Sequence, residues 1–248
     1  MTVVIPARYR SERLPGKPLV PVAGKPLIRR VWESLAEGWK GKILVATDDA
    51  RVLDAVQAFG GEAFLTSANH KSGTERVAEA SKNLPAGIVV NVQGDELFVG
   101  AAMIREITEP FGKDASLKMA SLRRPLESTE DLLNPNIVKV VVDSQGFALY
   151  FSRRALPYVR GEADGVPRDI SNSSIFHRHV GLYAYRSDFL QELASWPETF
   201  LERAERLEQL RALEHGVRIH CAETSGKPFG VDTKEDVEEA ERRMKKNP

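Results

Sequence analysis

The chain has 248 residues, of which 42% are hydrophobic, and its 35 basic side chains balance 35 acidic ones. Zero net charge argues against a nucleic-acid or membrane-surface protein, because both classes usually carry a basic excess. The only cysteine, Cys221, excludes an intrachain disulfide and fits a reducing compartment. The N-terminus does not resemble a signal peptide, and no run reaches the roughly 18 apolar residues of a membrane helix, so we expect a soluble, cytoplasmic protein.

Short apolar strands alternate with helices in the first half of the chain. The residue pattern predicts strands at 3–5, 42–47, 62–65 and 88–92, and helices at 28–36, 50–59 and 72–81. Continuous apolar strands that alternate with helices are typical of a parallel sheet covered on both faces. We therefore expect an α/β fold with a doubly wound, mostly parallel sheet.

The second half is richer in strands. The pattern predicts strands at 118–122, 138–142, 147–151, 180–185 and 217–221, a hairpin turn at 143–146, and helices at 201–213 and 234–245. Residues 160–174 are polar and indicate a mobile loop. No change in composition marks a linker, so we expect a single domain over residues 1–248, with a smaller β-rich insertion at about 118–185.

A basic segment follows the first predicted strand. From Arg8 to Arg30 there are seven basic residues and one acidic residue, Glu12. Open α/β sheets bind ligands at the carboxyl ends of their strands, and arginine and lysine are suited to phosphate groups. We interpret the segment as a polyphosphate-binding loop, although a solvated charged loop is the alternative. It contains neither a P-loop nor the Gly-x-Gly-x-x-Gly pattern of a dinucleotide site.

Two aspartates each lie within two residues of a preceding glycine, in the segments QGDE at 93–96 and GVDT at 230–233. Asp95 comes after the predicted strand at 88–92, and Asp232 lies near the C-terminus. Mg²⁺ prefers oxygen ligands and commonly takes one or two carboxylates together with substrate phosphates, so this pair could hold it. Each residue also has a structural explanation, because Asp232 or Thr233 could cap the last helix and Asp95 could hold a turn.

Two further polar clusters have a helical explanation. Ser72 followed by Glu75 matches a capping box, although a helix N-terminus can also bind an anion. The pair Asp48 and Asp49 follows the predicted strand at 42–47 and indicates a helix cap rather than a ligand.

A series of short blocks, in order along nearly the whole chain, resembles one enzyme family. The blocks are IPARYRSERLPGKPL at 5–19, HKSGTER at 70–76, NVQGDE at 91–96, NPN at 134–136, ALYFSR at 148–153, HVGLY at 179–183, LEQLR at 207–211 and GVDT at 230–233. In these blocks the chain resembles the 3-deoxy-manno-octulosonate cytidylyltransferases, also called CMP-KDO synthetases. One departure is Leu97, since members of this family usually have proline at that position.

The resemblance implies a Rossmann-like nucleotidyltransferase fold and the reaction of CTP with KDO to give CMP-KDO and pyrophosphate, which feeds lipopolysaccharide assembly. It also implies Mg²⁺ as cofactor and a homodimer that pairs through the β-rich insertion, with no nucleic-acid or membrane partner. Another sugar acid, such as 8-amino-KDO or a sialic acid, is the nearest alternative substrate. More distant alternatives are a nucleotidyltransferase that acts on a sugar 1-phosphate and a nucleotide-binding regulator that has lost catalysis.

The resemblance also assigns roles to individual residues by position. The triphosphate would be held by Arg8, Arg13 and Lys17, while the nucleotide and part of the sugar pocket would be lined by Ala7, Ser72, Arg76 and Gln93. Asp95 and Asp232 would hold magnesium and, with Lys17 and Arg8, would form the catalytic set. The sugar acid would be faced by Gln93, Arg153, Arg160, His179, Tyr183, Glu208 and Gln209.

Overall fold

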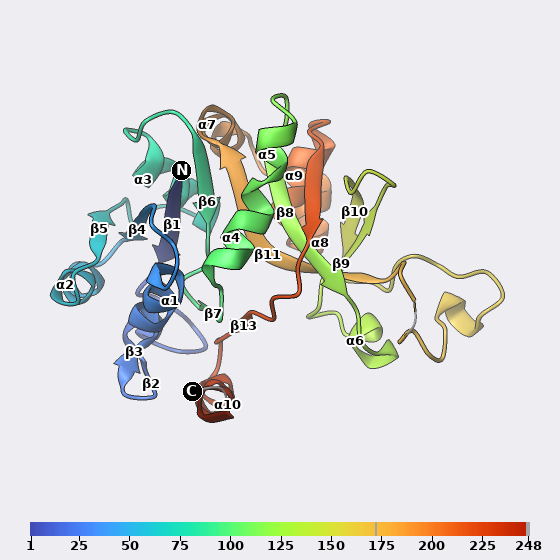
Figure 1. Cartoon of the computed structure of the whole chain (residues 1–248), viewed down its shortest axis with the longest axis horizontal. Helices are drawn as coiled ribbons and strands as arrows, with labels where there is room; N and C mark the ends of the chain where they lie inside the picture. The colour runs from blue at the N-terminus through green and yellow to red at the C-terminus, as the bar shows by residue number, and fades with distance from the viewer. Residues whose placement is uncertain (172, 247–248) are drawn as a thin grey trace. The chain divides into compact units, whose positions relative to one another are not determined.

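The strands of the first half form a parallel sheet, as the apolar pattern predicts. In the computed structural model, which describes residues 1–171 and 173–246, these strands lie in the order β6 (Ile88–Asn91), β1 (Thr2–Ala7), β4 (Lys42–Thr47) and β5 (Glu62–Leu65) (Figure 1). Each neighbouring pair is parallel. Val3, Val4 and Ile5 of β1 are fully buried, as expected for the centre of a sheet that is covered on both faces.

The chain divides into two compact units. The first comprises Met1–Arg105, Tyr185–Ala194 and Gly226–Pro248, and the second comprises Glu106–Ala184 and Ser195–Ser225. Residues 118–184, the bulk of the predicted β-rich insertion, belong to the second unit. The single-domain organisation stays a prediction. Among residues 1–171 and 173–246, no helix has the length and the apolar character that crossing a membrane requires.

Helices accompany the parallel sheet of the first unit. They are α1 (Leu27–Ala36), α2 (Ala50–Ala58), α3 (Gly73–Ser81), most of α4 (Ala101–Thr108), most of α7 (Ser187–Ser195) and α10 (Lys234–Lys246). The unit also contains the 3-10 turn η1 (Lys17–Leu19) and the short strands β2 (Pro21–Val22), β3 (Lys25–Pro26), β7 (Glu96–Leu97) and β13 (Phe229–Gly230). In α1 the side chains of Leu27, Val31 and Leu35, which lie four residues apart, are all buried, as expected for a helix with one apolar face.

Two predicted helix caps are confirmed. The Asp49 carboxylate accepts a hydrogen bond of 3.0 Å from the Arg51 amide at the start of α2. The Ser72 hydroxyl accepts one of 3.2 Å from the Glu75 amide at the start of α3. The Glu75 carboxylate accepts a hydrogen bond of 2.8 Å from the Lys71 amide, so the side chains of Ser72 and Glu75 together satisfy two backbone amides at the N-terminus of α3.

The second unit has a mixed sheet. Its strands lie in the order β10 (Ala148–Ser152), β9 (Lys139–Val142), most of β11 (His177–Arg186), β8 (Met119–Pro125) and β12 (Ile219–Glu223). The β9–β10 and β9–β11 pairs are antiparallel, and β8 and β12 are parallel. The predicted hairpin turn at 143–146 is confirmed, with Gly146 at a φ of 83° that favours glycine.

The helices of the second unit differ from the prediction in one place that bears on function. They are α5 (Pro110–Lys113), α6 (Thr129–Leu133), α8 (Phe200–Glu205), α9 (Gln209–Glu214) and the 3-10 turn η2 (Ala163–Gly165). The single helix predicted at 201–213 is wrong, because Arg206 adopts a left-handed φ of 53° and separates α8 from α9. Leu207 and Leu210 are nevertheless both buried, so the apolar spacing continues through the break and hides it in the sequence.

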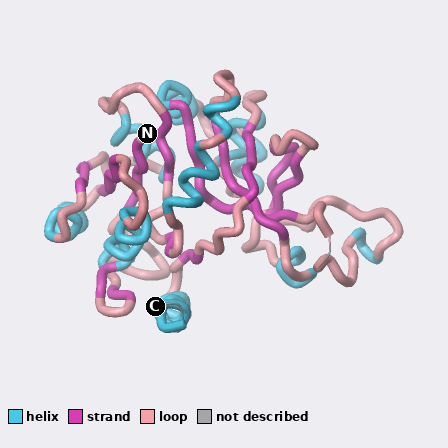
Figure 2. Tube along the Cα trace, viewed as in Figure 1, coloured by secondary structure: helices cyan, strands magenta, loops and turns pink. Residues whose placement is uncertain are grey.

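The segment between β10 and β11 is almost entirely loop, apart from η2 (Figure 2). This agrees with the polar composition of residues 160–174, of which residue 172 lies outside the described part of the chain.

Candidate active site

The basic segment after β1 opens onto a pocket in the first unit. The pocket has a volume of about 220 Å³ and is lined by Pro6, Ala7, Arg8, Arg10, Ser11, Lys17, Pro18, Gly73, Gln93, Gly94 and Asp95. These residues end β1, lie in the loop and η1 after it, follow β6 or begin α3, so the pocket lies at the carboxyl ends of neighbouring parallel strands. It therefore brings together five of the predicted site residues: Ala7, Arg8, Lys17, Gln93 and Asp95.

A glycine and a half-buried arginine shape this pocket. A Cβ atom on Gly94 would lie 2.6 Å from the Pro6 carbonyl oxygen, so only glycine lets the segment after β6 approach β1 this closely. The Arg8 Nη2 atom is buried and has no hydrogen-bond partner in the described part of the chain. Such a charged donor needs an acceptor, which an anionic ligand would supply.

Lys17 joins the two aspartates that the sequence singles out. Its Nζ atom donates a hydrogen bond of 2.7 Å to Asp232 Oδ1 and another to Asp95 Oδ2. Arg13 Nη2 also pairs with Asp232 Oδ1 at 2.9 Å. The Lys17 side chain is only 12% exposed, so the two carboxylates meet around a largely buried ammonium group. Residues from opposite ends of the sequence thus form one charged cluster.

The pKa values of Lys17 and Asp232 are both shifted by their surroundings. Burial acts to lower the pKa of Lys17, but the Asp95 charge and the hydrogen bonds to both aspartates outweigh burial and hold the pKa above its ordinary value. For Asp232 burial acts to raise the pKa, yet the hydrogen bond and charge of Lys17, followed by those of Arg13, hold it below its ordinary value. Both shifts favour the charged forms at neutral pH.

The start of α10 is capped by Thr233 and Asp236 and not by the Asp232 side chain. The Thr233 hydroxyl accepts a hydrogen bond of 3.2 Å from the Asp236 amide, which caps α10. The Asp236 carboxylate in turn accepts from the amides of Asp232 and Thr233, each at 2.9 Å. The Asp232 side chain is not needed as a cap and points instead to Lys17.

A short two-stranded ladder fixes the backbone of both aspartates. Strand β7 pairs with β13, and the Val231 amide donates a hydrogen bond of 3.0 Å to the Asp95 carbonyl oxygen. Leu97, at the position where the family usually has proline, is 1% exposed and takes part in this ladder opposite Phe229. Leucine at this position is therefore compatible with the pairing.

The two carboxylates suit a magnesium ion that is shared with a ligand. They converge on one positive charge, Lys17 Nζ, so one cation can reach both. Among residues 1–171 and 173–246, no group of three or more His, Cys, Asp or Glu side chains is arranged to hold a metal ion. Mg²⁺ commonly combines one or two carboxylates with phosphate oxygens, and the residues present fit that mode.

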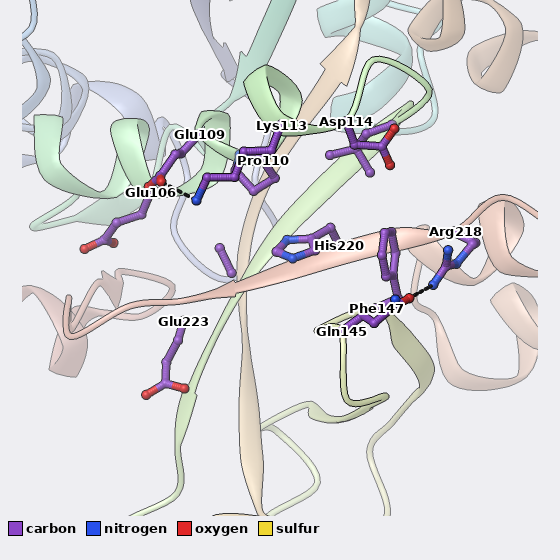
Figure 3. Close-up of a pocket in the computed structure, with 12 residues that line it drawn as sticks. Glu106, Glu109, Pro110, Lys113, Asp114, Gln145, Phe147, Arg218, His220 and Glu223 are labelled. Carbon is purple, nitrogen blue, oxygen red and sulfur yellow. Dashed lines mark hydrogen bonds and ion pairs between the residues drawn. The ribbon is translucent and has the colours of Figure 1, made fainter.

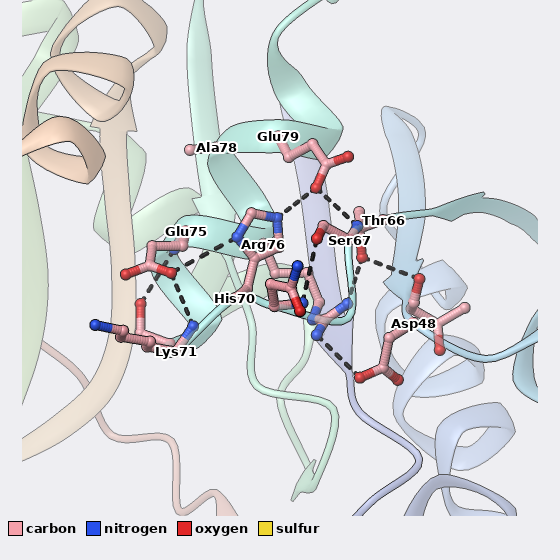
Figure 4. Close-up of polar contacts among 12 residues, drawn as sticks. Asp48, Thr66, Ser67, His70, Lys71, Glu75, Arg76, Ala78 and Glu79 are labelled. Carbon is pink, nitrogen blue, oxygen red and sulfur yellow. Dashed lines mark hydrogen bonds and ion pairs between the residues drawn. The ribbon is translucent and has the colours of Figure 1, made fainter.

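Arg76 occupies a different place from the other predicted nucleotide-binding residues. Its side chain is 0% exposed, and its guanidinium donates to Asp48 Oδ2 at 3.1 Å and to the Thr66 hydroxyl (Figure 4). Burial lowers the pKa of Arg76, and the Asp48 charge only partly offsets that effect. The contact of Arg76 with a nucleotide stays a prediction, as does that of Ser72, whose hydroxyl caps α3.

In the second unit the structure brings together three of the predicted sugar-facing residues. The Tyr183 hydroxyl donates a hydrogen bond of 2.9 Å to Gln209 Oε1, and the rings of Tyr183 and His179 are centred 5.4 Å apart. Gln209 begins α9, so the break at Arg206 sets its position. Its Nε2 atom is buried without a hydrogen-bond partner in the described part of the chain, which leaves a donor for a ligand.

His179 is held as a neutral ring. Burial, followed by the charge of Arg178, lowers its pKa to about 3. Its Nε2 atom lies 2.7 Å from the Ser121 hydroxyl oxygen, which lies 2.8 Å from the Leu182 carbonyl oxygen. The one hydroxyl proton goes to the carbonyl oxygen, so His179 Nε2 donates to Ser121 and its Nδ1 atom is left as an acceptor.

The remaining sugar-facing candidates lie at the edge of this group. Arg153 is anchored by backbone, since its Nε atom donates to the Glu205 carbonyl oxygen at 2.8 Å and Nη1 to that of Pro135 at 3.1 Å. Arg160, in the loop before β11, and Glu208, immediately before α9, are exposed. Their roles stay predictions.

Sequence reasoning missed two residues that support the predicted ones. Ser121 orients His179, and a lone serine within an apolar strand was the available signal. Asp48 was interpreted with Asp49 as a helix cap, but only Asp49 caps α2, whereas Asp48 contacts the Tyr9 amide and Arg76. Nothing in the local sequence distinguishes the two aspartates.

A second and larger pocket belongs to the other face of the second unit's sheet. It measures about 590 Å³, and Figure 3 shows it between α5 and β12, beside His220 and Phe147. Ser121, which contacts His179, is in register with Cys221, so the adjacent His220 points to the opposite face. The lining contains none of the predicted site residues, all of which the structure describes.

Comparison with known proteins identifies the family. A family model described as cytidylyltransferase matches residues 2–219. The 3-deoxy-manno-octulosonate cytidylyltransferase of Trichlorobacter lovleyi is 46% identical over 248 residues, 99% of this chain and 98% of that protein. The protein of the same name from Pseudomonas fluorescens is 47% identical over 245 residues, 97% of this chain and 96% of that protein.

A solved structure agrees with these sequences. The structure of CMP:2-keto-3-deoxy-manno-octonic acid synthetase complexed with CTP superposes with a TM-score of 0.90 at 40% identity, covering 100% of this chain and 99% of that one. With this similarity in sequence and fold over the whole length, the chain belongs to the cytidylyltransferase family and, within it, to the 3-deoxy-manno-octulosonate cytidylyltransferases.

Proposed function

We propose that the chain transfers a cytidylyl group from CTP to KDO, which yields CMP-KDO and pyrophosphate for lipopolysaccharide biosynthesis. The names of the relatives and the CTP-bound solved structure support these substrates. The observation that carries the proposal is the charged cluster of Lys17, Asp95 and Asp232 beside the pocket after β1. That cluster combines a triphosphate-binding cation with carboxylates for a hard metal ion.

The basic residues after β1 would hold the triphosphate. Arg8 can donate two hydrogen bonds to a phosphate group, and Lys17 offers a compact charge at the pocket wall. Arg13, already paired with Asp232, is close enough to share its charge with the same ligand. These cations offset the charge that develops on the pyrophosphate as it leaves.

Magnesium dependence is part of the proposal. Asp95 and Asp232 would hold the ion, and when bound Mg²⁺ supplies charge neutralisation at the phosphate oxygens and at the leaving group. The Lys17 ammonium bonds both carboxylates and lines the pocket, where it could also bond a phosphate oxygen. The protein itself makes the two carboxylates converge on Lys17 and favours the ionised form of Asp232, whose pKa is lowered.

The residues of the second unit would recognise the sugar acid. Neutral His179, Tyr183 and Gln209 offer a set of donors and acceptors suited to sugar hydroxyls, while Arg153 and Arg160 would pair with the sugar carboxylate. The anomeric hydroxyl would attack the α-phosphorus of CTP, with pyrophosphate leaving in line. Holding both reactants near attack distance can contribute about 7–11 kcal/mol.

A protein nucleophile is not required by this scheme. Cys221 is fully buried, and burial raises the pKa of its thiol to about 12, so it is not a thiolate at neutral pH. Transfer by positioning and charge neutralisation therefore remains the mechanism that the side chains support best.

A cytoplasmic homodimer that pairs through the β-rich insertion completes the proposal. Leu149, Tyr158 and Ile175 lie within residues 118–185 and expose between 50% and 71% of their surface. Exposed apolar side chains of this size favour an interface.

A pyrophosphate-release screen tests the proposed function. The four nucleoside triphosphates would each be combined with KDO, 8-amino-KDO and a sialic acid, with and without Mg²⁺. We expect release with CTP, KDO and Mg²⁺ together. A clear preference for 8-amino-KDO or a sialic acid would assign that sugar as the substrate in place of KDO. Pyrophosphate release without a sugar or without Mg²⁺ would reject the mechanism.

A further inference from the structure

Asp48 connects the basic loop to the interior of the first unit. It follows β4 directly, and its side chain is 14% exposed. Its Oδ1 atom accepts a hydrogen bond of 3.1 Å from the Tyr9 amide, and its Oδ2 atom accepts one of 3.1 Å from Arg76 Nη2. The two oxygens of one carboxylate therefore bond two segments that are far apart in the sequence, and Figure 4 shows the contact with Arg76.

The Arg76 side of this link is rigid. The guanidinium is wholly buried and also donates to the Thr66 hydroxyl, which donates to the Thr47 carbonyl oxygen at 2.9 Å. A buried guanidinium needs a carboxylate partner, and Asp48 supplies it. Asp48 is consequently held in one orientation by a network that is anchored on β4 and α3.

The Tyr9 side of the link bears on the triphosphate loop. Tyr9 immediately follows Arg8, which lines the pocket. The Tyr9 ring is covered by the Arg51 guanidinium at 3.6 Å, and its hydroxyl lies 3.2 Å from the position of a Cβ on Gly16. Tyr9 is thus a fixed point between Arg8 and η1, and the Asp48 hydrogen bond is what ties its backbone to the sheet.

We propose that Asp48 is a positioning residue for nucleotide binding: by bonding the Tyr9 amide and Arg76 at once, it sets the direction in which Arg8 meets the triphosphate. This role rests on the proposed function, in which Arg8 binds CTP. Asp48 itself need not touch the ligand, and it acts through the backbone of the loop.

The substitution Asp48→Asn isolates this role. An amide side chain has one acceptor oxygen, so it can satisfy the Tyr9 amide or Arg76 but not both. Asp54→Asn is a matched control, because Asp54 is exposed on α2 and the change leaves both hydrogen bonds of Asp48 in place. The two variants carry the same change in charge.

Steady-state kinetics and hydrogen exchange test the proposal together. For Asp48→Asn we expect kcat/KM for CTP to fall by about 10- to 100-fold while KM for KDO stays near the wild-type value, since a small misplacement of a binding group has effects of this size. The Tyr9 amide should exchange faster in this variant. Asp54→Asn should match the wild type in both measurements.

Several results would overturn the role of Asp48. Kinetics of Asp48→Asn equal to those of Asp54→Asn, or a loss of stability with an unchanged kcat/KM for CTP, would show that Asp48 is only structural. If Asp48→Asn does not fold, Asp48→Glu takes its place, since it keeps both oxygens but displaces them by one methylene and should raise KM for CTP. If the wild type itself releases no pyrophosphate, the proposed function fails, and calorimetric binding of tripolyphosphate by the two variants still decides the role of Asp48.

Discussion

Charged side chains from the loop after β1 and from two later segments form one cluster. Lys17 satisfies Asp95 and Asp232 at the same time, and Arg13 adds a second positive charge to Asp232. Because Thr233 and Asp236 cap α10, the Asp232 side chain contributes to this cluster and not to helix stability. Activity and stability can therefore be separated by mutation at neighbouring positions.

Substitution of Asp232 should affect turnover far more than folding. The side chain is 42% exposed, so Asp232→Asn should leave the protein folded while it removes one carboxylate of the pair. We expect kcat to fall by about 100-fold or more, because a metal ligand in such a site contributes several kcal/mol to transition-state stabilisation.

The control for this prediction is Asp236→Ala. This change removes the carboxylate that accepts from the two amides before α10 and should lower the free energy of unfolding by about 0.5–2 kcal/mol without changing kcat. Pyrophosphate release and urea unfolding, measured on both variants, separate the two effects. Equal turnover in Asp232→Asn and wild type would show that Asp232 is not a ligand of the proposed metal ion.

Because the pKa of His179 is lowered in the folded protein, the free energy of unfolding should depend on pH. Its pKa is lowered from 6.5 to about 3 by burial, so between these values the unfolded chain binds a proton that the native protein does not. Stability is therefore lost as the pH falls below 6.5, by up to about 1.4 kcal/mol per pH unit. Replacement of His179 by Gln should make the fall in unfolding free energy between pH 7 and pH 5.5 smaller by about 1 kcal/mol. If urea unfolding gives the variant and the wild type the same change in unfolding free energy between pH 7 and pH 5.5, a group other than His179 binds the proton on unfolding.

Among the elements, the break between α8 and α9 has the clearest local cause. Arg206 is held at a φ of 53°, which allows Gln209 to begin a new helix and reach Tyr183. A left-handed conformation is unfavourable for a residue that has a Cβ atom and neutral for glycine.

The substitution Arg206→Gly should stabilise the protein. Relief of the left-handed strain is expected to raise the free energy of unfolding by up to about 1 kcal/mol. Arg203→Gly, inside α8 and also exposed, should instead lower it by about 0.5–1 kcal/mol. Urea unfolding compares the two variants, and a loss of stability in Arg206→Gly would mean that its side chain supports the break.

The sequence predicts regular elements better than it predicts the break and the supporting contacts. The strands at 42–47 and 62–65 have the predicted bounds, because continuous apolar runs flanked by turns leave little ambiguity. Helices α4 to α7 were not predicted, and apolar spacing conceals the break at Arg206. The contact of Ser121 with His179 joins residues 58 positions apart, which no local pattern can indicate.

At the scale of the whole molecule, the predicted roles fall into two separate groups. The residues assigned to CTP and magnesium belong to the first unit, and those assigned mainly to the sugar, from Arg153 to Gln209, belong to the second. In the first group Lys17 joins Asp95 and Asp232 through charged hydrogen bonds, whereas in the second a neutral hydrogen bond joins Tyr183 to Gln209. Net charge over the chain is zero, so electrostatic binding depends on where the charges gather and not on their sum.

The most direct test of the central claim is the rate of pyrophosphate release from CTP and KDO by Lys17→Met beside the wild type. Methionine keeps the length of a side chain that is 12% exposed but removes its charge. We predict that the wild type releases pyrophosphate only with both substrates, and that the folded variant is slower by about 100-fold or more. A wild-type rate in Lys17→Met would contradict the account.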